Sequence, residues 1–409
     1  MTIFKYLPLA IAALVWIAMP LRPANAQGDT RPDLMTFAAG VLPLSVETGG
    51  SAMRVDMTAA IAAIDGNPGG FNATAKPGTG ADVVEITYAL PALTRFDRFA
   101  IPNILETPSP SQTFFRNIEV LGSASAADAG FVTLATGTLS THEGRDMMTE
   151  LALAADQPEV MWIRLRLSDG IKVERDKTYF EFSELIANGT QRDVELSDGF
   201  AGVWKGRGVK IELAQDGATV TGCYDSNSEL AGTVEGRVLR ALGHDSAGIA
   251  SQFILIAADN GALSGLRSTN GAPFKPYNGE ASDKPPACLS PEPPVLGCGA
   301  IVHGIGFDYD SDVIRDGSQT LIAALFDGLK ADGGTGIVIT GHSSSEGQAD
   351  YNRDLSQRRA QAVVDALVAL GLDAAQISAS GRGEDDPIAS NADEAGRSMN
   401  RRVEVQCAG

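Results

Sequence analysis

The sequence predicts a multidomain protein in which an N-terminal all-β sandwich, jelly-roll-like, and a small all-β sheet or barrel domain precede a C-terminal α/β domain. A chain of 409 residues exceeds the usual size of one domain. Short runs of alternating apolar and polar residues, separated by Gly, Pro, Asn and Asp, fill the chain before residue 315, where helical periodicity is scarce. After a Pro-rich segment at 280–297 strands and helices alternate, which is typical of an α/β fold.

Residues 1–26 have the pattern of a secretory signal peptide. Lys5 precedes an apolar run over 6–19, and the small-residue motif at 24–26 predicts cleavage before Gln27. A membrane anchor is the alternative, but the run is shorter than the ~20 residues that a spanning helix needs. No Cys follows the cleavage site to carry a lipid, and no later segment is long and apolar enough to span. We therefore expect export to the periplasm and no transmembrane span.

The charge of the chain excludes one class of partner. Its 51 acidic and 32 basic residues give a net charge of -19. Nucleic acids and anionic lipids would be repelled by such a protein, because binding them requires basic groups that displace counterions. We expect no nucleic-acid partner.

Residues 27–195 are expected to form a β-sandwich. In the run at 161–170 the aliphatic side chains lie on one face, whereas Arg164 and Arg166 lie on the other, as in a strand with one solvated face. The segment resembles the discoidin-like (galactose-binding-like) jelly roll, in the order RFDRFAIPN, FFRNIEVLGS, WIRLRL and FEFSELIANG. That resemblance implies a module that binds a glycan or an envelope protein through loops at one end. No ligand residue can be matched, and a structural spacer is the alternative.

Residues 196–279 are expected to form a second β unit, a small antiparallel sheet or barrel of five or six strands. Asp-Gly and Asn-Gly dipeptides at 216–217 and 260–261 separate alternating runs, which indicates hairpins. Trp204 and Tyr224 either line a binding surface or belong to the core, and single aromatic residues in strands favour the core. The ligand of this unit does not follow from its sequence.

Four cysteines in an exported chain predict disulfides rather than metal ligands or redox centres, since none forms a CxxC pair. Three pairings are possible. We favour Cys223 with Cys288 and Cys298 with Cys407, because each pair then lies within one segment. Between the segments, the prolines of 280–297 disfavour helix and sheet and predict an extended linker.

Residues 298–409 alternate between strand and helix patterns, which predicts a compact α/β sandwich. The expected strands are IVHGIGFDYDS, IVITGH, ISASG and NRRVEVQC, and the expected helices are TLIAALFDGLK and LSQRRAQAVVDALVALGL.

This segment resembles the C-terminal domain of the OmpA family. The motifs that carry the resemblance, in order and at the proper spacing, are FDYDS, GH followed by a loop, YNRDLSQRRAQAV, GRGEDDPIASN and GRSMNRRVEV. The family implies non-covalent binding of the peptidoglycan stem peptide, centred on its diaminopimelate residue. It also implies association with the cell wall and outer membrane of a Gram-negative bacterium.

Diaminopimelate offers a carboxylate and an ammonium, so its binder needs a fixed cation and a fixed acceptor. Arg359 matches the family's ligand arginine in LSxxRA, and a guanidinium meets a carboxylate with two parallel hydrogen bonds. Asn352 lies seven residues earlier, so both side chains share one helix face, which should look toward the loop after His342. The alternative for Arg359 is an ordinary solvated charge.

One position departs from the family. Many members carry GHTD, whose Asp accepts from the ligand ammonium, whereas Ser344 stands at that position here. A hydroxyl still accepts a hydrogen bond but loses the charge assistance. Glu346 and Asp350 are the nearby carboxylates that would replace the missing anion.

The last motif adds Asn391, Arg397 and Arg402 to the expected ligand-binding set. Arg397 and Arg402 either contact the ligand or brace the fold by pairing with acidic residues. Asn391 either contacts the ligand or caps a turn.

No enzyme pattern is present. The four histidines have no HxxxH or HExxH spacing, and neither a GxSxG elbow nor a Cys-His nucleophile is found. We expect no catalytic residue, no cofactor and no metal. The sequence favours a non-catalytic envelope protein anchored to peptidoglycan, whose β modules present a binding surface. The alternatives are a carbohydrate-binding or adhesive sandwich merely tethered to the wall and, less favoured, a wall-processing hydrolase.

Overall fold

The computed structural model describes most of the chain after residue 30, and the signal peptide predicted at 1–26 lies outside the described residues. No helix among the described residues is long and apolar enough to cross a membrane. The described ranges are 31–48, 55–67, 69–75, 83–102, 115–139, 148–170, 178–225, 228–258, 261–284, 288, 296–308, 310–333 and 335–408.

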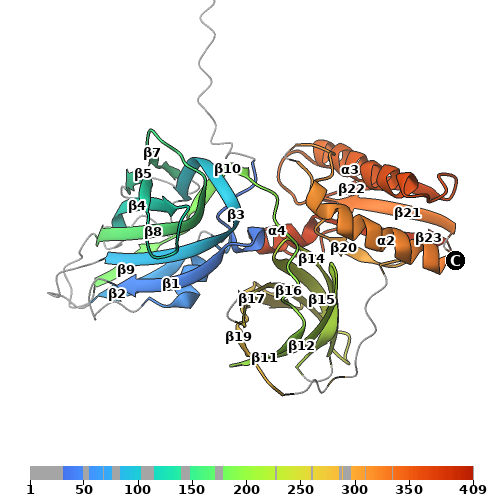
Figure 1. Cartoon of the computed structure of the whole chain (residues 1–409), viewed down its shortest axis with the longest axis horizontal. Helices are drawn as coiled ribbons and strands as arrows, with labels where there is room; N and C mark the ends of the chain where they lie inside the picture. Colours follow the sequence, from blue (N-terminus) through green and yellow to red (C-terminus); the bar gives the residue numbers. More distant parts are fainter. Residues whose placement is uncertain are drawn as a thin grey trace, which may run out of the picture. The chain divides into compact units, whose positions relative to one another are not determined.

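The N-terminal module consists of an eight-stranded antiparallel sheet and a separate pair of strands (Figure 1). The large sheet runs in the order β1-β3-β8-β4-β5-β7, with β6 and β10 also paired to β3. Its strands are β1 (Leu42–Thr48), β3 (Val83–Pro102), β4 (Phe115–Ser123), β5 (Val132–Thr138), β6 (Met148–Glu150), β7 (Ala152–Leu153), β8 (Val160–Gly170) and β10 (Ile186–Gln191). The pair is β2 (Phe71–Ala75) and β9 (Thr178–Phe182), and two short helices are η1 (Phe37–Ala39) and α1 (Met57–Ala62).

Strand β3 organises this module because it changes partners along its length. Its first half pairs with β1 and β8, the register shifts between Ala89 and Thr94, and its second half pairs with β10 and β6. A bulge of this kind bends a strand and increases its twist. The predicted alternation of β8 is confirmed, since Ile163, Leu165 and Leu167 are fully buried. The sheets agree with an all-β module, whereas the discoidin-like resemblance remains a prediction.

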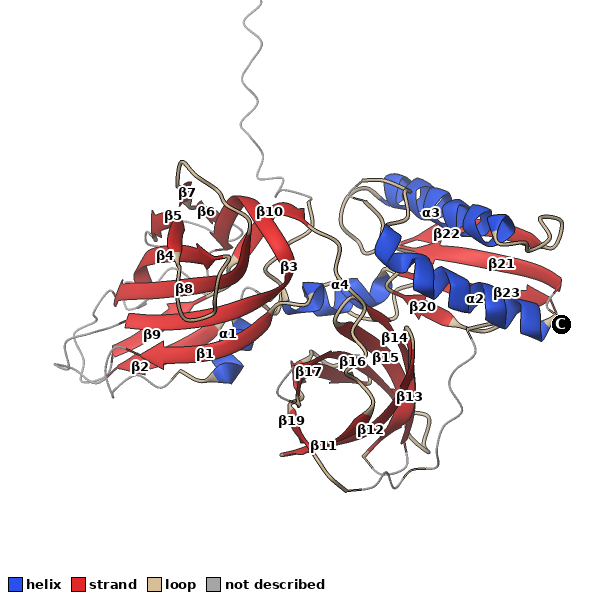
Figure 2. Ribbon diagram, in the orientation of Figure 1, coloured by secondary structure: helices blue, strands red, loops and turns tan. Residues whose placement is uncertain are grey.

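The middle module is a closed antiparallel β-barrel (Figure 2). Eight strands form the ring β16-β15-β14-β13-β12-β11-β19-β17, which closes through pairing of β16 with β17, and β18 pairs with β17 outside it. The expected five or six strands were therefore too few, because the short β19 completes the ring. The strands are β11 (Gly202–Gly206), β12 (Val209–Asp216), β13 (Thr219–Tyr224), β14 (Ser228–Glu235), β15 (Val238–His244), β16 (Ala250–Ala257), β17 (Ala262–Thr269), β18 (Lys275–Pro276) and β19 (Gly279–Ala281).

The barrel interior explains its aromatic residues. Trp204 and Tyr224 are 4% and 1% exposed and belong to the apolar core of the barrel, so the core interpretation of both is correct. Gly217, at φ +54°, makes the turn between β12 and β13 that the Asp-Gly dipeptide predicts.

The C-terminal module is a four-stranded sheet with two long helices packed against it (Figure 1). The strand order is β20-β23-β21-β22, with β21 and β22 parallel and the other pairs antiparallel. Each of the two long helices has one apolar face, and both faces pack with the sheet in a single apolar core. The elements are β20 (Ile301–His303), η2 (Asp316–Ser318), α2 (Gln319–Asp332), β21 (Thr335–His342), α3 (Ala349–Ala369), β22 (Ile377–Gly383), α4 (Glu394–Asn400) and β23 (Arg402–Ala408).

Both predicted disulfides are present, Cys223–Cys288 and Cys298–Cys407. The linker is shorter at both ends than the 280–297 that we expected. Residues 279–281 form β19 of the barrel, while Leu296 is 5% exposed in the core of the C-terminal module.

Candidate functional site

Some of the predicted site residues, among them His342, Ser344 and Asn352, lie where β21 and β22 end against α3. A Cβ at Gly341 would lie 2.3 Å from the carbonyl oxygen of Ser356, and one at Gly381 would lie 2.4 Å from the backbone nitrogen of Gln357. Only glycine allows the sheet and the helix to approach so closely. The glycines of the GH and GRG motifs thus bring α3 to the loop that follows β21.

The loop after β21 is held by Asn352 of α3. The Asn352 amide donates to the backbone oxygen of Ser344 at 3.3 Å and to Glu384 at 2.6 Å. Ser344 is 6% exposed, and its hydroxyl donates to Oε2 of Glu346 at 3.2 Å. Asn352 therefore positions the loop, and its amide has polar partners within the protein.

Arg359 is a partly buried residue of α3 that has no carboxylate partner within the described part of the chain. Its Nε donates to the backbone oxygen of Ser311 at 3.0 Å, and its guanidinium lies 4.9 Å from the ring centroid of Phe307. Burial, with the nearby Arg401 and Arg358, lowers its pKa to about 10. It stays charged at neutral pH, and contacts the loop after Phe307 rather than the GHSSSEG loop that we expected it to face.

Arg401 is a further cation of this region, which the sequence prediction passed over. It pairs with Glu394, and its Nη1 lies 3.7 Å from Glu346. Burial opposes its charge, but Glu394 outweighs this and raises the pKa of Arg401. The NRRV motif that contains it was the available signal.

Arg397 occupies the neighbouring position on α4. Its Nε lies 2.8 Å from Glu394 and 3.6 Å from Glu346. The structure thus contains the acid pairing that was one of the two interpretations of Arg397, although its side chain is still 21% exposed.

Arg402 and His342 were both predicted to bind the ligand, and the structure buries both side chains almost completely. The Arg402 side chain is 2% exposed and donates to Glu404, with a further bond to the backbone oxygen of Asp386. The His342 side chain is 3% exposed, with Nε2 3.6 Å from Glu404. Burial and the adjacent Arg402 lower the pKa of His342. Arg402 braces the fold, because such a buried charge needs its internal partners.

Asn391 contacts the loop after β21 and the end of α4. Its Oδ1 accepts from the backbone nitrogen of Ser345 at 3.3 Å and from Asn400 at 2.9 Å. Asp350, by contrast, is fully exposed and has Arg353 as its ion-pair partner, at 3.9 Å. Of the two carboxylates offered as replacements for the family Asp, Glu346 is therefore the one that touches the loop.

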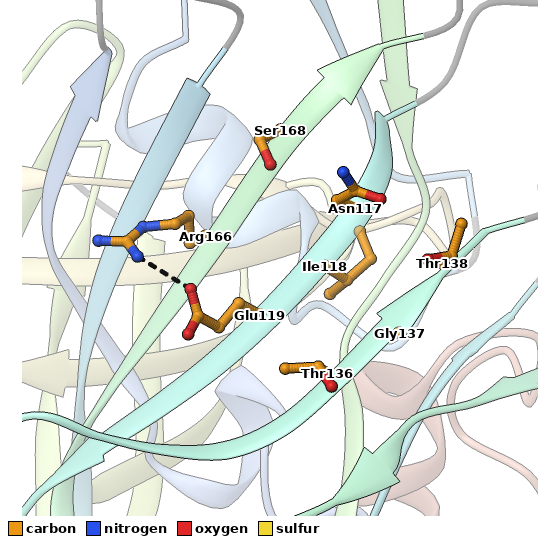
Figure 3. A pocket seen from close by; sticks show the side chains of 8 residues that line it. All are labelled: Asn117, Ile118, Glu119, Thr136, Gly137, Thr138, Arg166 and Ser168. Atoms are coloured by element: carbon orange, nitrogen blue, oxygen red, sulfur yellow. Dashed lines mark hydrogen bonds and ion pairs between the residues drawn. The ribbon is translucent and has the colours of Figure 1, made fainter.

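A second candidate surface is a shallow hollow of about 310 Å³ on the N-terminal sheet (Figure 3). Asn117 and Glu119 of β4, Thr136 and Thr138 of β5 and Arg166 of β8 supply its polar side chains. Arg166 donates to Glu119 at 2.9 Å and to Glu85 at 2.5 Å. Its charged groups are thus already paired with one another.

One group of potential metal ligands occurs among the described residues, Glu212 with Cys223 and Cys288. The two sulfur atoms are bonded to each other, so they are not thiolates available to a metal. The group does not form a metal site.

Comparison with known proteins identifies the C-terminal module. The model of the OmpA family matches residues 306–401. Outer membrane porin F of Pseudomonas fluorescens is 42% identical over 101 residues, which cover 25% of this chain and 31% of that protein. The peptidoglycan-associated lipoprotein of Pseudomonas putida is 35% identical over 100 residues, or 24% of this chain and 60% of that protein.

A solved relative is the peptidoglycan-associated lipoprotein of Burkholderia pseudomallei, 36% identical over 25% of this chain and 88% of its own, with a TM-score of 0.24. The chain spans about a third of the length of the first curated relatives it matches. The C-terminal module is an OmpA-like domain. It is homologous to domains of OmpA proteins and peptidoglycan-associated lipoproteins.

Proposed function

We propose that this protein is a non-catalytic component of a Gram-negative cell envelope, held non-covalently to peptidoglycan by its OmpA-like domain. The ligand is the stem peptide, recognised at its diaminopimelate residue. The observation that carries this proposal is Arg359. It stands at the position of the family's ligand arginine and lacks a carboxylate partner in the described chain, so its guanidinium is available for a ligand carboxylate.

The proposal is supported by the names of relatives, which include peptidoglycan-associated lipoproteins and the peptidoglycan-binding protein ArfA of Mycobacterium tuberculosis. It gains further support from the arrangement around Arg359. Burial strengthens an electrostatic contact, and the guanidinium lies over the aromatic ring of Phe307 in a cation–π contact.

Sedimentation of the mature protein with purified peptidoglycan tests the proposal. Arg359→Ala should weaken binding by about 1.5–3 kcal/mol, the usual value of a hydrogen bond to a charged group. Arg358→Ala is a matched control, because Arg358 is the adjacent arginine and already pairs with Asp354 and Asp312. Equal binding by a folded Arg359→Ala variant would reduce Arg359 to a surface charge.

The β modules are proposed to present a binding surface to a glycan or an envelope protein. A second candidate function makes the N-terminal module, with its discoidin-like pattern, the principal binder and the OmpA-like domain its tether. The polar hollow beside Asn117 and Arg166 favours it. Glycan-array binding by the mature protein that is lost in Asn117→Ala but kept in Arg359→Ala would support this second function.

A further inference from the structure

Glu346 is the carboxylate at the centre of the loop contacts. Its Oε2 accepts from Ser344 and lies 3.7 Å from Arg401, while its Oε1 lies 3.6 Å from Arg397. Both arginines lie closer to Glu394, which is 13% exposed. The two cations therefore hold Glu346 in place while their main partner is another acid.

Glu346 still has capacity to accept a hydrogen bond. Its side chain is 54% exposed, and within the described part of the chain no hydrogen bond to its Oε1 occurs. A carboxylate has about four lone-pair sites, of which Ser344 uses one here. An incoming ammonium can reach this oxygen from solvent.

Among the described residues, the other carboxylates near the site do not contact the loop that contains Ser344. Asp350 is fully exposed beside Arg353, and Asp312 pairs with Arg358 at 3.7 Å. Asp310 lies near enough to Arg359 to raise its pKa, but it belongs to the loop after Phe307, on the side of the cation. Glu346 instead neighbours Arg401, which in turn lowers the pKa of Arg359. Arg401 is thus close enough to both Glu346 and Arg359 to act on each of them electrostatically.

We propose that Glu346 receives the side-chain ammonium of the stem peptide and replaces the carboxylate that Ser344 lacks. This inference rests on the proposed function, in which Arg359 binds the ligand carboxylate. Ser344 acts as a positioning residue, since its hydroxyl orients Glu346 through Oε2. The site then selects stem peptides whose side-chain amine is free, because acylation removes the charge that Glu346 recognises.

Calorimetric titration of the mature protein tests this with two probes, L-alanyl-γ-D-glutamyl-meso-diaminopimelate and the same tripeptide acetylated on its side-chain amine. Glu346→Gln should weaken binding of the free amine about tenfold and leave binding of the acetylated peptide unchanged, since a charge-assisted bond is about twice as strong as a neutral one. Asp350→Asn removes the same charge and should bind both probes as wild type does, whereas Asp310→Asn should change binding of both probes equally, because Asp310 acts on Arg359 and not on the ligand ammonium.

The double variant Ser344→Asp/Glu346→Gln distinguishes loss of the recognising carboxylate from a change in the structure of the loop. It returns a carboxylate to the family position and should recover most of the preference for the free amine. Equal losses for both peptides in Glu346→Gln, or a loss confined to Asp350→Asn or Asp310→Asn, would overturn the role of Glu346. If wild type bound neither the peptides nor purified peptidoglycan, the proposed function itself would fail.

Discussion

At the scale of single residues, the motifs name residues that lie close together but do not assign a role to each side chain. His342, Ser344, Asn352 and Asn391 all lie in or beside the loop after β21. Arg402, however, is buried against Glu404. A motif reports which residue types recur together, whereas exposure depends on packing by distant segments, so sequence alone could not separate bracing from binding.

Arg359→Lys should bind peptidoglycan more weakly than wild type although the charge is kept. An ammonium cannot make two parallel hydrogen bonds to a carboxylate, and it stacks less well on the ring of Phe307. We expect a loss of about 1–2 kcal/mol, comparable to one hydrogen bond to a charged group. Titration with a diaminopimelate-containing stem peptide measures it, and wild-type affinity would show that charge alone is recognised.

Ser344→Asp alone should leave the affinity for the stem peptide unchanged or lower it. Ser344 is buried and its hydroxyl lies 3.2 Å from Oε2 of Glu346, so a second carboxylate there would repel the first. The same titration checks this. A tighter complex would mean that the site had lacked an anion and that Glu346 does not supply it.

At the scale of elements, the long helices and the strands of the C-terminal module were predicted, although β20 ends at His303 and does not continue through FDYDS as expected. The short helices were not predicted. α4 was missed although Asp393 caps it by accepting from the backbone nitrogen of Gly396. α1 was missed in the same way, with Asp56 as its cap. Helices of six or seven residues carry too little periodicity to be recognised, and packing rather than propensity stabilises them.

Gly341→Ala should destabilise the C-terminal module by about 1–3 kcal/mol, because the added methyl group would collide with the backbone of α3 rather than with a flexible side chain. Denaturant unfolding of the mature protein measures the effect. Gly317→Ala is a matched control, since its Cβ would lie 3.7 Å from the nearest atom, the oxygen of Val194. Equal stability of both variants would contradict the close approach of β21 and α3.

The Cys298–Cys407 bridge should contribute strongly to the same module. It closes a loop with a sequence separation of 109 residues, for which the chain-entropy model gives about 4–5 kcal/mol, less any strain. Replacing both cysteines by serine should lower the free energy of unfolding by a value up to this range. Non-reducing peptide mapping should recover the two pairs found here, and a Cys223–Cys407 peptide would contradict them.

At the scale of the whole molecule, sequence predicted three modules but not the residues through which they meet. Met399 of α4 is fully buried in the same apolar cluster as Phe37 of the N-terminal module and Ile254 of the barrel. The Thr233 hydroxyl of the barrel donates to the backbone oxygen of His303 at 2.7 Å. Such contacts join segments 70 or more residues apart, and no local pattern encodes them.

Where the N-terminal module meets α4, three carboxylates have raised pKa values. Burial raises the pKa of Asp33 and of Asp65 to about 7, and burial together with these two neighbours raises that of Glu184 well above its usual value. Glu394 and Arg397 of α4 face the cluster with opposite charges. The folded protein therefore keeps protons that the unfolded chain has lost above about pH 4.

It follows that the contribution of this cluster to stability is complete below about pH 4 and is lost as the pH rises through about 7. The pKa of Glu394 shifts in the opposite direction. Burial raises it, but Arg401 and Arg397 outweigh burial and lower it. The contribution of Glu394 to stability is therefore lost on acidification.

Glu184→Gln should consequently raise the melting temperature at pH 8 and reduce its fall between pH 5 and pH 8. Glutamine keeps an oxygen for the backbone nitrogen of Gly66, which Glu184 now accepts from, and removes only the ionisable proton. A gain of 1 kcal/mol corresponds to about 2–4 °C for a domain of this size. Asp128→Asn, in an exposed loop, is the control and should leave the pH profile unchanged. A melting temperature lowered equally at every pH would mean that Glu184 is ionised in the folded protein and that its charge stabilises the junction with α4.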